Sequence, residues 1–256
     1  MRKRAGNTWL KKNRNDIYYK KAKQQNYRAR SIFKLEQLNN KFNILKVRGK
    51  NALSILDIGC APGSWLQWLS QKIMPETQDI SQNIIREKHK LEKKIDESSA
   101  NDSNQKKEES KTITTIKSSN HSPQKLLVGV DLTTIKPIEG VEFHRGNIFD
   151  DSFIDELVQL YSQGFQVILS DAAYKTIGNQ DTDHARQIGL AERVLFIADR
   201  LLLPGGNCLI KIFEGVDALT FLKEHESKFE RAKLSKPDAS RKESKEIYFI
   251  GKGFEK

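Results

Sequence analysis

Cysteine is scarce in this chain, with two residues in 256, which excludes a disulfide-stabilised scaffold and suits a reducing compartment. Long apolar runs are also absent, because no stretch reaches the roughly 18 uncharged apolar residues of a membrane-spanning helix. The first residues lack the apolar core of a secretory signal peptide. We therefore expect a soluble, cytoplasmic protein that engages no membrane.

Several common ligand-binding patterns are missing as well. The dinucleotide-binding pattern G-x-G-x-x-G fails because Ala61 and Ser64 stand where glycines are required. The same turn has no lysine of the kind that phosphate-binding loops use. No matching set of Cys and His ligands exists, so we expect Cys60 and Cys208 to be reduced packing residues and the protein to hold no metal.

The excess positive charge is concentrated at one end of the chain. The net charge is +11, and residues 1–30 supply ten of these charges, with eleven Lys and Arg against one acid, Asp16. Contacts between such side chains and phosphates are favourable whatever the base sequence, because they release counterions. Interleaved aromatic rings are able to stack on unpaired bases: Trp9, Tyr18, Tyr19 and Tyr27. We interpret residues 1–30 as a basic RNA-binding arm; the alternatives are a solvated tail and an organelle-targeting peptide.

Residues 76–124 differ in composition from the rest of the chain. They contain no glycine and no aromatic residue, and they consist mainly of Lys, Glu, Ser, Asn and Gln. A segment with so little to bury predicts a low-complexity insertion, disordered at its centre, that interrupts one domain. Its charges nearly cancel, which disfavours a second RNA-binding arm. Residues 31–256 then form a single domain that carries this insertion.

Outside the insertion, short apolar runs alternate with amphipathic segments. The spacing predicts helices over 27–42, 63–73, 153–161, 184–203 and 216–229, and strands over 52–58, 126–130, 141–144, 165–170, 207–213 and 246–251. This alternation indicates an α/β fold whose mostly parallel sheet is covered by helices on both faces. Ligands of such sheets bind beyond the carboxyl ends of the strands.

Two features at these strand ends suit a nucleotide-like ligand. The segment DIGCAPGSW, residues 57–65, follows the first apolar strand and opens a helix. Gly59 and Gly63 let the backbone approach a ligand, while the start of the helix directs N–H groups toward it. Asp131 ends the second strand, where a carboxylate can accept hydrogen bonds from a ribose. These features fit a dinucleotide fold and an S-adenosylmethionine (SAM) fold, and the absence of G-x-G-x-x-G favours the second.

The segment DIGCAPGSW resembles the SAM-binding loop of the FtsJ-type, or RrmJ-like, ribose 2′-O-methyltransferases. Further blocks follow the order of that family: WLKKNRNDIYYKKAKQQNYRARSIFKL (9–35), GVDL (129–132), GVEFHRGNI (140–148), SDAA (170–173), LLPGGNCLIKIFEG (202–215) and KPDASRKESKEIYFIGKGF (236–254). The resemblance implies a Rossmann-like SAM-dependent methyltransferase fold with a mostly parallel seven-stranded sheet. The basic start and the closing block resemble the ribosomal-RNA branch of the family more than its tRNA or mRNA-cap branches.

The resemblance also implies the site residues. A catalytic tetrad of two lysines and two acids falls on Lys34, Asp171, Lys211 and Glu246, and the cofactor-binding residues fall on Asp57, Gly59, Gly63, Trp65, Asp131, Asn147 and Asp171. Two positions depart from the family pattern. Asn147 stands where an Asp is usual beside the adenine, and Tyr174 stands where a Pro is typical. Tyr174 is expected to stack on the substrate base or the adenine, or to cover the site.

The implied reaction is transfer of a methyl group from SAM to the 2′-hydroxyl of a ribose, expected to be that of a uridine, in 23S-type large-subunit ribosomal RNA. A base is needed because this hydroxyl is a poor nucleophile, and Lys211 is the expected base, with Lys34 as a second cation. The expected partner is ribosomal RNA or the large ribosomal subunit, and the expected state is a monomer. The alternatives are a methyltransferase of tRNA anticodon-loop ribose, a non-catalytic RNA-binding ribosome-assembly factor and, more distantly, an NAD(P)-dependent oxidoreductase.

Overall fold

The computed structural model describes residues 16–73 and 125–255. Trp9 and the insertion predicted at 76–124 lie outside the described residues. Within the described ranges, no helix is both long enough and apolar enough to cross a membrane.

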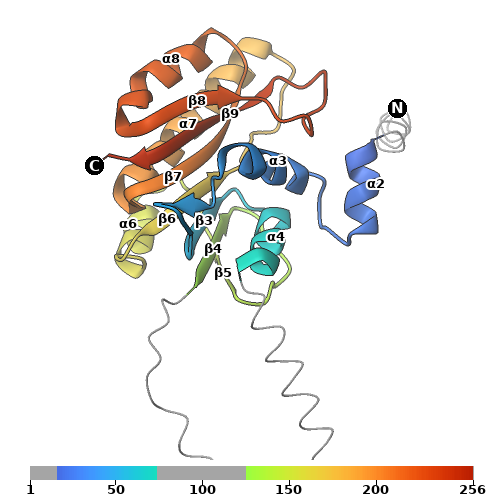
Figure 1. The fold of residues 1–256 in the computed structure, drawn as a ribbon. Coiled ribbons are helices and arrows are strands. Elements are labelled where there is room, and N and C mark those ends of the chain that lie inside the picture. The colour runs from blue at the N-terminus through green and yellow to red at the C-terminus, as the bar shows by residue number, and fades with distance from the viewer. Residues whose placement is uncertain (1–15, 74–124, 256) are drawn as a thin grey trace, which may run out of the picture.

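A seven-stranded sheet built from both sides of the insertion forms the centre of the molecule (Figure 1). Its strands, in spatial order, are β5 (Val141–Arg145), β4 (Leu126–Asp131), β3 (Ser54–Ile58), β6 (Phe165–Ser170), β7 (Leu202–Phe213), β9 (Glu246–Phe254) and β8 (Phe229–Ser235). The first five strands run parallel, and β9 runs antiparallel to both of its neighbours. The prediction of a mostly parallel seven-stranded sheet is therefore confirmed.

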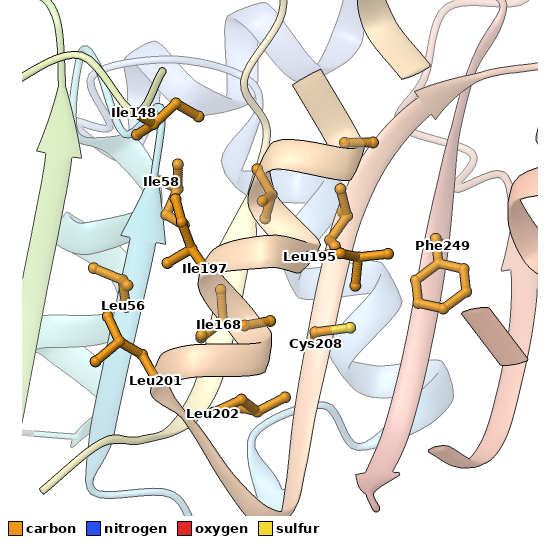
Figure 2. Close-up of a cluster of buried hydrophobic side chains, with 14 of the residues drawn as sticks. Leu56, Ile58, Ile148, Ile168, Leu195, Ile197, Leu201, Leu202, Cys208 and Phe249 are labelled. Atoms are coloured by element: carbon orange, nitrogen blue, oxygen red, sulfur yellow. The ribbon is translucent and has the colours of Figure 1, made fainter. Parts of the chain in front are cut away.

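Helices cover both faces of this sheet, as predicted. The residues of α3 (Ile32–Phe42) and α4 (Ser64–Ile73) share one hydrophobic cluster with the strands. The residues of α6 (Asp151–Leu160), α7 (Gln180–Leu201) and α8 (Val216–His225) share the other, part of which Figure 2 shows. Alternate residues of a strand belong to different clusters, because successive side chains of a strand point to opposite faces of the sheet. On β9, for example, Phe249 joins one cluster and its neighbours Tyr248 and Ile250 join the other.

The α4 helix returns the chain to the edge of the sheet opposite the predicted site. It begins at Ser64, just beyond the carboxyl end of β3, and ends at Ile73. Lys125, the first described residue after the gap, lies immediately before the start of β4. Ile73 and Lys125 line the same surface hollow. Both attachment points of the insertion therefore lie at the amino ends of the parallel strands.

Two strand assignments differ from the sequence-based prediction. The helix predicted to run to residue 229 ends at His225, a short 3₁₀ turn (Glu226–Lys228) follows, and Phe229 begins β8. This strand escaped prediction because it is a solvent-facing edge strand rich in charge, with the sequence FERAKLS. In addition, residues 204–206 were expected to lie between the helix and the next strand. They lie within β7, which begins at Leu202, and the pairing of β7 with β6 is irregular in this region.

The second half of the basic segment is folded against the domain. Residues Ile17–Gln24 form α2, and the rings of Tyr18 and Tyr27 lie 5.5 Å and 6.2 Å from the ring of Phe33 on α3. These two half-buried rings thus contact the folded domain. Stacking of RNA bases on the aromatic rings of this segment stays a prediction, as does RNA binding by residues 1–30.

Both cysteines are buried and free, as expected. Burial raises the pKa of the Cys208 thiol to about 12 and raises that of Cys60 as well. A thiol with a raised pKa is a poor nucleophile and a poor metal ligand. The described structure therefore supports a packing role for these two side chains.

Candidate active site

The topology of the sheet brings the four predicted tetrad residues to one edge. Asp171 directly follows β6, and Lys211 lies near the carboxyl end of the adjacent parallel strand β7. Because β9 is antiparallel to β7, its first residue, Glu246, reaches the same edge and pairs with Phe213. Lys34 projects onto this edge from α3, so three strands and one helix supply the group.

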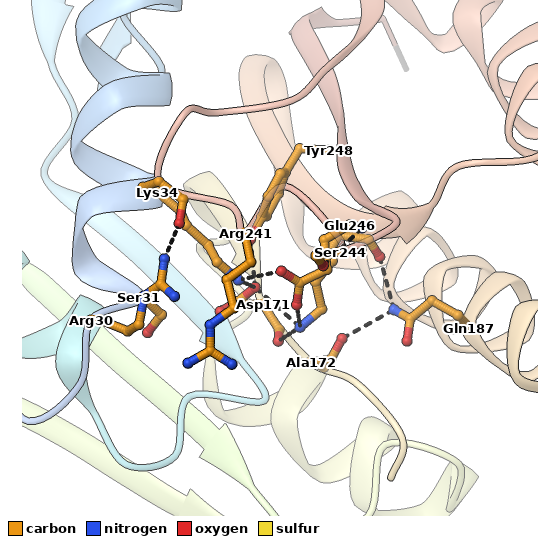
Figure 3. A network of polar contacts seen from close by, with 12 residues as sticks. Arg30, Ser31, Lys34, Asp171, Ala172, Gln187, Arg241, Ser244, Glu246 and Tyr248 are labelled. Atoms are coloured by element: carbon orange, nitrogen blue, oxygen red, sulfur yellow. Dashed lines mark hydrogen bonds and ion pairs between the residues drawn. The ribbon is translucent and has the colours of Figure 1, made fainter. Parts of the chain in front are cut away.

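Each lysine of the tetrad contacts both carboxylates, and Figure 3 shows Lys34, Asp171 and Glu246 of this group. The Nζ atom of Lys34 lies 2.9 Å from Oε2 of Glu246 and 3.7 Å from Oδ1 of Asp171. The Nζ atom of Lys211 lies 3.1 Å from Oδ1 of Asp171 and 3.7 Å from Oε1 of Glu246. Two cations and two anions therefore alternate in a closed arrangement with no net charge.

Burial and pairing act in opposite directions on these groups. The side chains are 5 to 23% exposed, with Lys211 the least accessible. Burial acts to raise the pKa of Asp171 and Glu246, but the two ammonium groups outweigh it and hold both values below the usual range. Burial acts to lower the pKa of Lys34, but the charges of Asp171 and Glu246 raise it above its usual value. Lys34 and the two acids are therefore charged at neutral pH.

Two residues that sequence reasoning missed hold this arrangement in place. The hydroxyl of Tyr248 donates to Oδ1 of Asp171 at 2.6 Å, and burial together with the nearby carboxylates raises the pKa of this phenol, so it stays a donor. The Nε2 atom of Gln187, on α7, donates to the backbone oxygens of Ala172 and Lys211 at 3.1 Å and 2.9 Å. Tyr248 lies two residues after Glu246 on the same strand face, a spacing that would have identified it, whereas Gln187 carries no comparable signal.

A cavity of about 590 Å³ lies beside the tetrad, at the carboxyl ends of the central strands. This volume is typical of a small-molecule site. Four of the predicted cofactor residues line it, namely Gly59, Asp131, Asn147 and Asp171. Asp171 belongs to both the cavity and the tetrad, so a ligand in this cavity would end next to the paired lysines.

The walls of this cavity fit a ligand that carries a ribose and a positive charge. Asp131 is oriented by backbone donors, since its carboxylate accepts from the N–H groups of Ala61 and Thr133 at 2.9 Å and 2.7 Å. Its remaining lone pairs are available to hydroxyl groups. Asp57 is fully buried behind the loop, and its Oδ2 atom has no hydrogen-bond partner among the described residues. Burial and the charges of Asp171 and Asp131 raise the pKa of Asp57, which favours its neutral form, so the ionised carboxylate on the wall that suits a cation is that of Asp171.

The sequence of this chain matches a known protein family over most of its length. A model of the FtsJ-like methyltransferase family matches residues 27–254. The chain belongs to this family. It is a SAM-dependent methyltransferase with a Rossmann-like fold, as the sequence predicts, and the cavity is the place where its residues fit the cofactor.

Relatives of this methyltransferase are similar over most of their length. The ribosomal RNA large subunit methyltransferase E of Methanothrix thermoacetophila is 34% identical over 95% of this chain and 74% of its own. The protein of that name from Methanothermobacter thermautotrophicus is 32% identical over 97% and 94%. A crystal structure of a Plasmodium falciparum protein described as a ribosomal RNA methyltransferase superposes with a TM-score of 0.63 at 23% identity, over 89% of this chain and 98% of that one. This last likeness concerns the fold alone.

Besides the buried Asp57, two residues predicted to bind the cofactor, Gly63 and Trp65, lie outside the cavity wall of this methyltransferase. The indole of Trp65 is buried, and its Nε1 atom donates to the backbone oxygen of Ser31 at 2.8 Å. Gly63 has φ +91°, and a Cβ added there would lie 2.9 Å from Nη1 of Arg28. That arginine also donates to Pro62, Lys136 and Pro137, which ties the loop to its neighbours. In this structure both residues shape the loop by packing.

The two departures from the family pattern both line the cavity. The Oδ1 atom of Asn147 accepts from the N–H of Phe149 at 3.1 Å, so its amide N–H groups remain available to a ligand. The ring of Tyr174 lies 4.5 Å from the guanidinium of Arg186 and 6.3 Å from the ring of Phe149. Arg186 covers one face of this ring, so stacking on the substrate base or the adenine would use the other face, and the choice between stacking and covering stays a prediction.

Replacement of Gly59 by alanine is expected to weaken SAM binding. Its φ is +72°, and an added Cβ would lie 2.4 Å from Cβ of Ala172, so the β3 and β6 loops would be forced apart. Gly49→Ala is the matched control, since this residue has φ +77° but open space around its Cβ position. We expect calorimetric titration to show at least about tenfold weaker SAM binding for Gly59→Ala and wild-type binding for Gly49→Ala. Equal affinities for the two variants would contradict this account of the cavity.

The acid sensitivity of the fold is expected to depend on the tetrad. Because the folded protein lowers the pKa of Asp171 and Glu246 from 3.8 and 4.5, these groups add stability above those values. That stability is lost as the pH falls through the lower, folded-state values. Urea unfolding between about pH 6 and pH 2 should therefore show a steep loss of stability in acid.

The Glu246→Gln variant tests the origin of this loss. It should be about 1–3 kcal/mol less stable at neutral pH, because a buried lysine loses a charged partner. Its stability should also fall less steeply in acid, since one of the two titrating carboxylates is gone. An unchanged slope would show that other acids control the acid unfolding.

Proposed function

We propose that this methyltransferase transfers a methyl group to the 2′-hydroxyl of a ribose in large-subunit ribosomal RNA. The observation that carries the proposal is the buried arrangement of Lys34, Asp171, Lys211 and Glu246 at the inner end of the cofactor cavity. Charged groups are costly to bury, and four of them gathered beside a cavity are typical of a site that moves a proton.

The lysines and acids of the tetrad have different roles in the proposed reaction. SAM, when bound, supplies a methyl group that its sulfonium already activates. Lys211 first releases its own proton to solvent. Its neutral amine, the least exposed of the four groups and held beside the carboxylate and the backbone oxygen of Asp171, then accepts the proton of the ribose hydroxyl. Lys34 stays protonated, because the charges of Asp171 and Glu246 raise its pKa. Glu246 holds Lys34 and orients the ribose.

Ribosomal RNA is the proposed substrate because the relatives reported above carry names of large-subunit ribosomal RNA methyltransferases. The basic residues of 1–30 would neutralise its phosphates, which makes binding strong without base contacts. We further propose that the protein acts as a monomer, since one chain supplies all four tetrad residues and the cavity. We also propose that it acts in the cytoplasm, where ribosomal RNA is found. A non-catalytic assembly factor would have no use for paired lysines and acids kept from water.

Methyl transfer from tritium-labelled SAM tests the substrate directly. Large ribosomal subunits, naked ribosomal RNA and tRNA are offered in separate reactions, and alkaline-resistant dinucleotides report methylation of the 2′-hydroxyl. We expect label in the large-subunit RNA, free or assembled. Label in tRNA alone would replace the proposal with an anticodon-loop methyltransferase. RNA binding without label in any substrate would favour an assembly factor.

Lys211→Met is expected to lower kcat by about 10²–10⁴, the usual contribution of a general base. The neutral side chain has a similar length, so SAM should still bind with an affinity close to that of the wild type. Lys233→Met is the matched control, because this lysine lies on the exposed edge strand β8. A Lys211→Met enzyme with wild-type turnover and normal SAM binding would remove Lys211 from the role of base.

A further inference from the structure

A second cavity adjoins the tetrad from another side. Its volume is about 360 Å³, and its walls are Arg30, Ser31, Lys34, Arg241, Glu243, Ser244 and Glu246. It reaches the tetrad through Lys34 and Glu246, whereas the cofactor cavity reaches it through Asp171 and has no wall residue in common with it. A ribose and a methyl donor can therefore approach the same lysines from different directions.

The size of this second cavity, about 360 Å³, suits one sugar and phosphate unit better than a whole cofactor. The 2′-hydroxyl and the 3′-phosphate of a nucleotide are attached to neighbouring carbons of its ribose. A ribose placed against Lys34 and Glu246 therefore brings a phosphate within a few bonds of the tetrad. The walls beyond the tetrad should then offer cationic donors to that phosphate.

Two arginines stand on these walls. Arg30 lies one helical turn before Lys34, and Arg241 lies in the loop between β8 and β9, five residues before Glu246. In the view of Figure 3, both side chains lie on the opposite side of the tetrad from Gln187. Guanidinium groups bind carboxylates and phosphates with the same planar set of donors. These two arginines are thus suited to a phosphodiester, whose two free oxygens can take one donor each.

An acid of this chain now lies between them. Oδ2 of Asp16 accepts a hydrogen bond from Nη1 of Arg30 and lies 3.4 Å from Nε of Arg241. The Asp16 side chain is only 9% exposed, although it belongs to the most basic segment of the chain. The Nε atom of Arg30 is buried and has no hydrogen-bond partner among the described residues. One carboxylate therefore serves both arginines and leaves a donor of Arg30 unused.

The helix that carries Asp16 is attached to α3 by surface side chains: Tyr18 contacts Phe33 and Gln37, and Lys21 contacts Phe33 and Glu36. Asp16 is the N-cap of α2 and accepts from the N–H of Tyr19 at 3.0 Å. Ala22 is the buried residue of this eight-residue helix, and Tyr18 contacts Phe33 from its surface. Figure 1 shows α2 beside the body, beyond the end of α3. Elements with little buried apolar surface open at a low cost in free energy, so this carboxylate can leave without disturbing the core.

We propose that Arg30 and Arg241 form a binding site for the RNA phosphodiester beside the methylated ribose, and that Asp16 occupies this site until RNA replaces it. The inference rests on the proposed function, because it takes the tetrad as the place of the ribose. Asp16 acts as an internal competitor with the charge of a phosphate. RNA then binds by exchanging one anion for another, and the exchange releases the start of α2.

Asp16→Asn is the decisive variant. Asparagine caps a helix about as well as aspartate, so α2 is kept while the competing charge is removed. We expect the variant to bind naked large-subunit ribosomal RNA about fivefold more tightly in filter-binding assays without SAM, the size of a modest ion pair. Its Tm should fall, because the two arginines lose their carboxylate partner. Opposite changes in stability and RNA affinity are expected for competition, and the Arg241→Gln background distinguishes it from the general gain that follows when an acid is removed from a basic surface.

Arg241→Gln provides the complementary test. Loss of one phosphate contact should weaken RNA binding by about tenfold and make the salt dependence shallower by about one ion. In this background Asp16→Asn should gain less affinity than in the wild type, because the two residues act at one site. Arg231→Gln is the matched control, since this arginine lies exposed on the edge strand β8.

The two proposals fail in different ways. Tighter RNA binding by Asp16→Asn without methyl transfer to any RNA would retain the phosphate site and overturn the proposed function. Normal methyl transfer to ribosomal RNA with unchanged or weaker binding by Asp16→Asn would retain the function and overturn the competition. An Arg241→Gln protein that binds RNA like the wild type would overturn the phosphate site itself.

Discussion

The four buried charged groups of the tetrad stabilise one another, and the active site at the carboxyl ends of the strands depends on this pairing. Each lysine of the tetrad needs both acids and each acid needs both lysines, because any one of them left alone would bear the full cost of desolvation. The sheet satisfies this demand through strand direction. β6 and β7 end at the edge where β9 begins, so Asp171, Lys211 and Glu246 meet there, and α3 completes the set with Lys34.

Much of this arrangement could be predicted from the sequence, because apolar runs mark buried parallel strands and their polar ends mark a site. Asp131, Asp171 and Lys211 were identifiable in this way, and the block order of the family supplied Glu246 and Lys34. β8 escaped because an exposed edge strand needs no apolar run, and FERAKLS has little to distinguish it from a loop. Cofactor binding by Trp65 stays a prediction; its indole donates to Ser31 in this structure, and a motif position does not specify which neighbour an indole contacts.

The basic segment shows a different limit of sequence reasoning. Charge and aromatic content predict RNA binding for residues 1–30, but they do not reveal which side chains are already engaged by the protein. Tyr18 and Tyr27 pack on Phe33, and the single acid, Asp16, lies between two arginines. Pairings between positions more than two hundred residues apart, such as Asp16 with Arg241, depend on the folded loop between β8 and β9 and leave no local pattern in the sequence.

The positions of the two attachment points of residues 74–124 bear on how freely the length of that segment can change in evolution. Ile73 and Lys125 lie at the amino ends of the strands, whereas the cofactor cavity and the tetrad lie at the carboxyl ends. The full height of the sheet thus separates the attachment points from the chemistry. The length of that segment is free to drift over evolutionary time, and a fluorophore or affinity handle grafted there would leave methyl transfer unaltered.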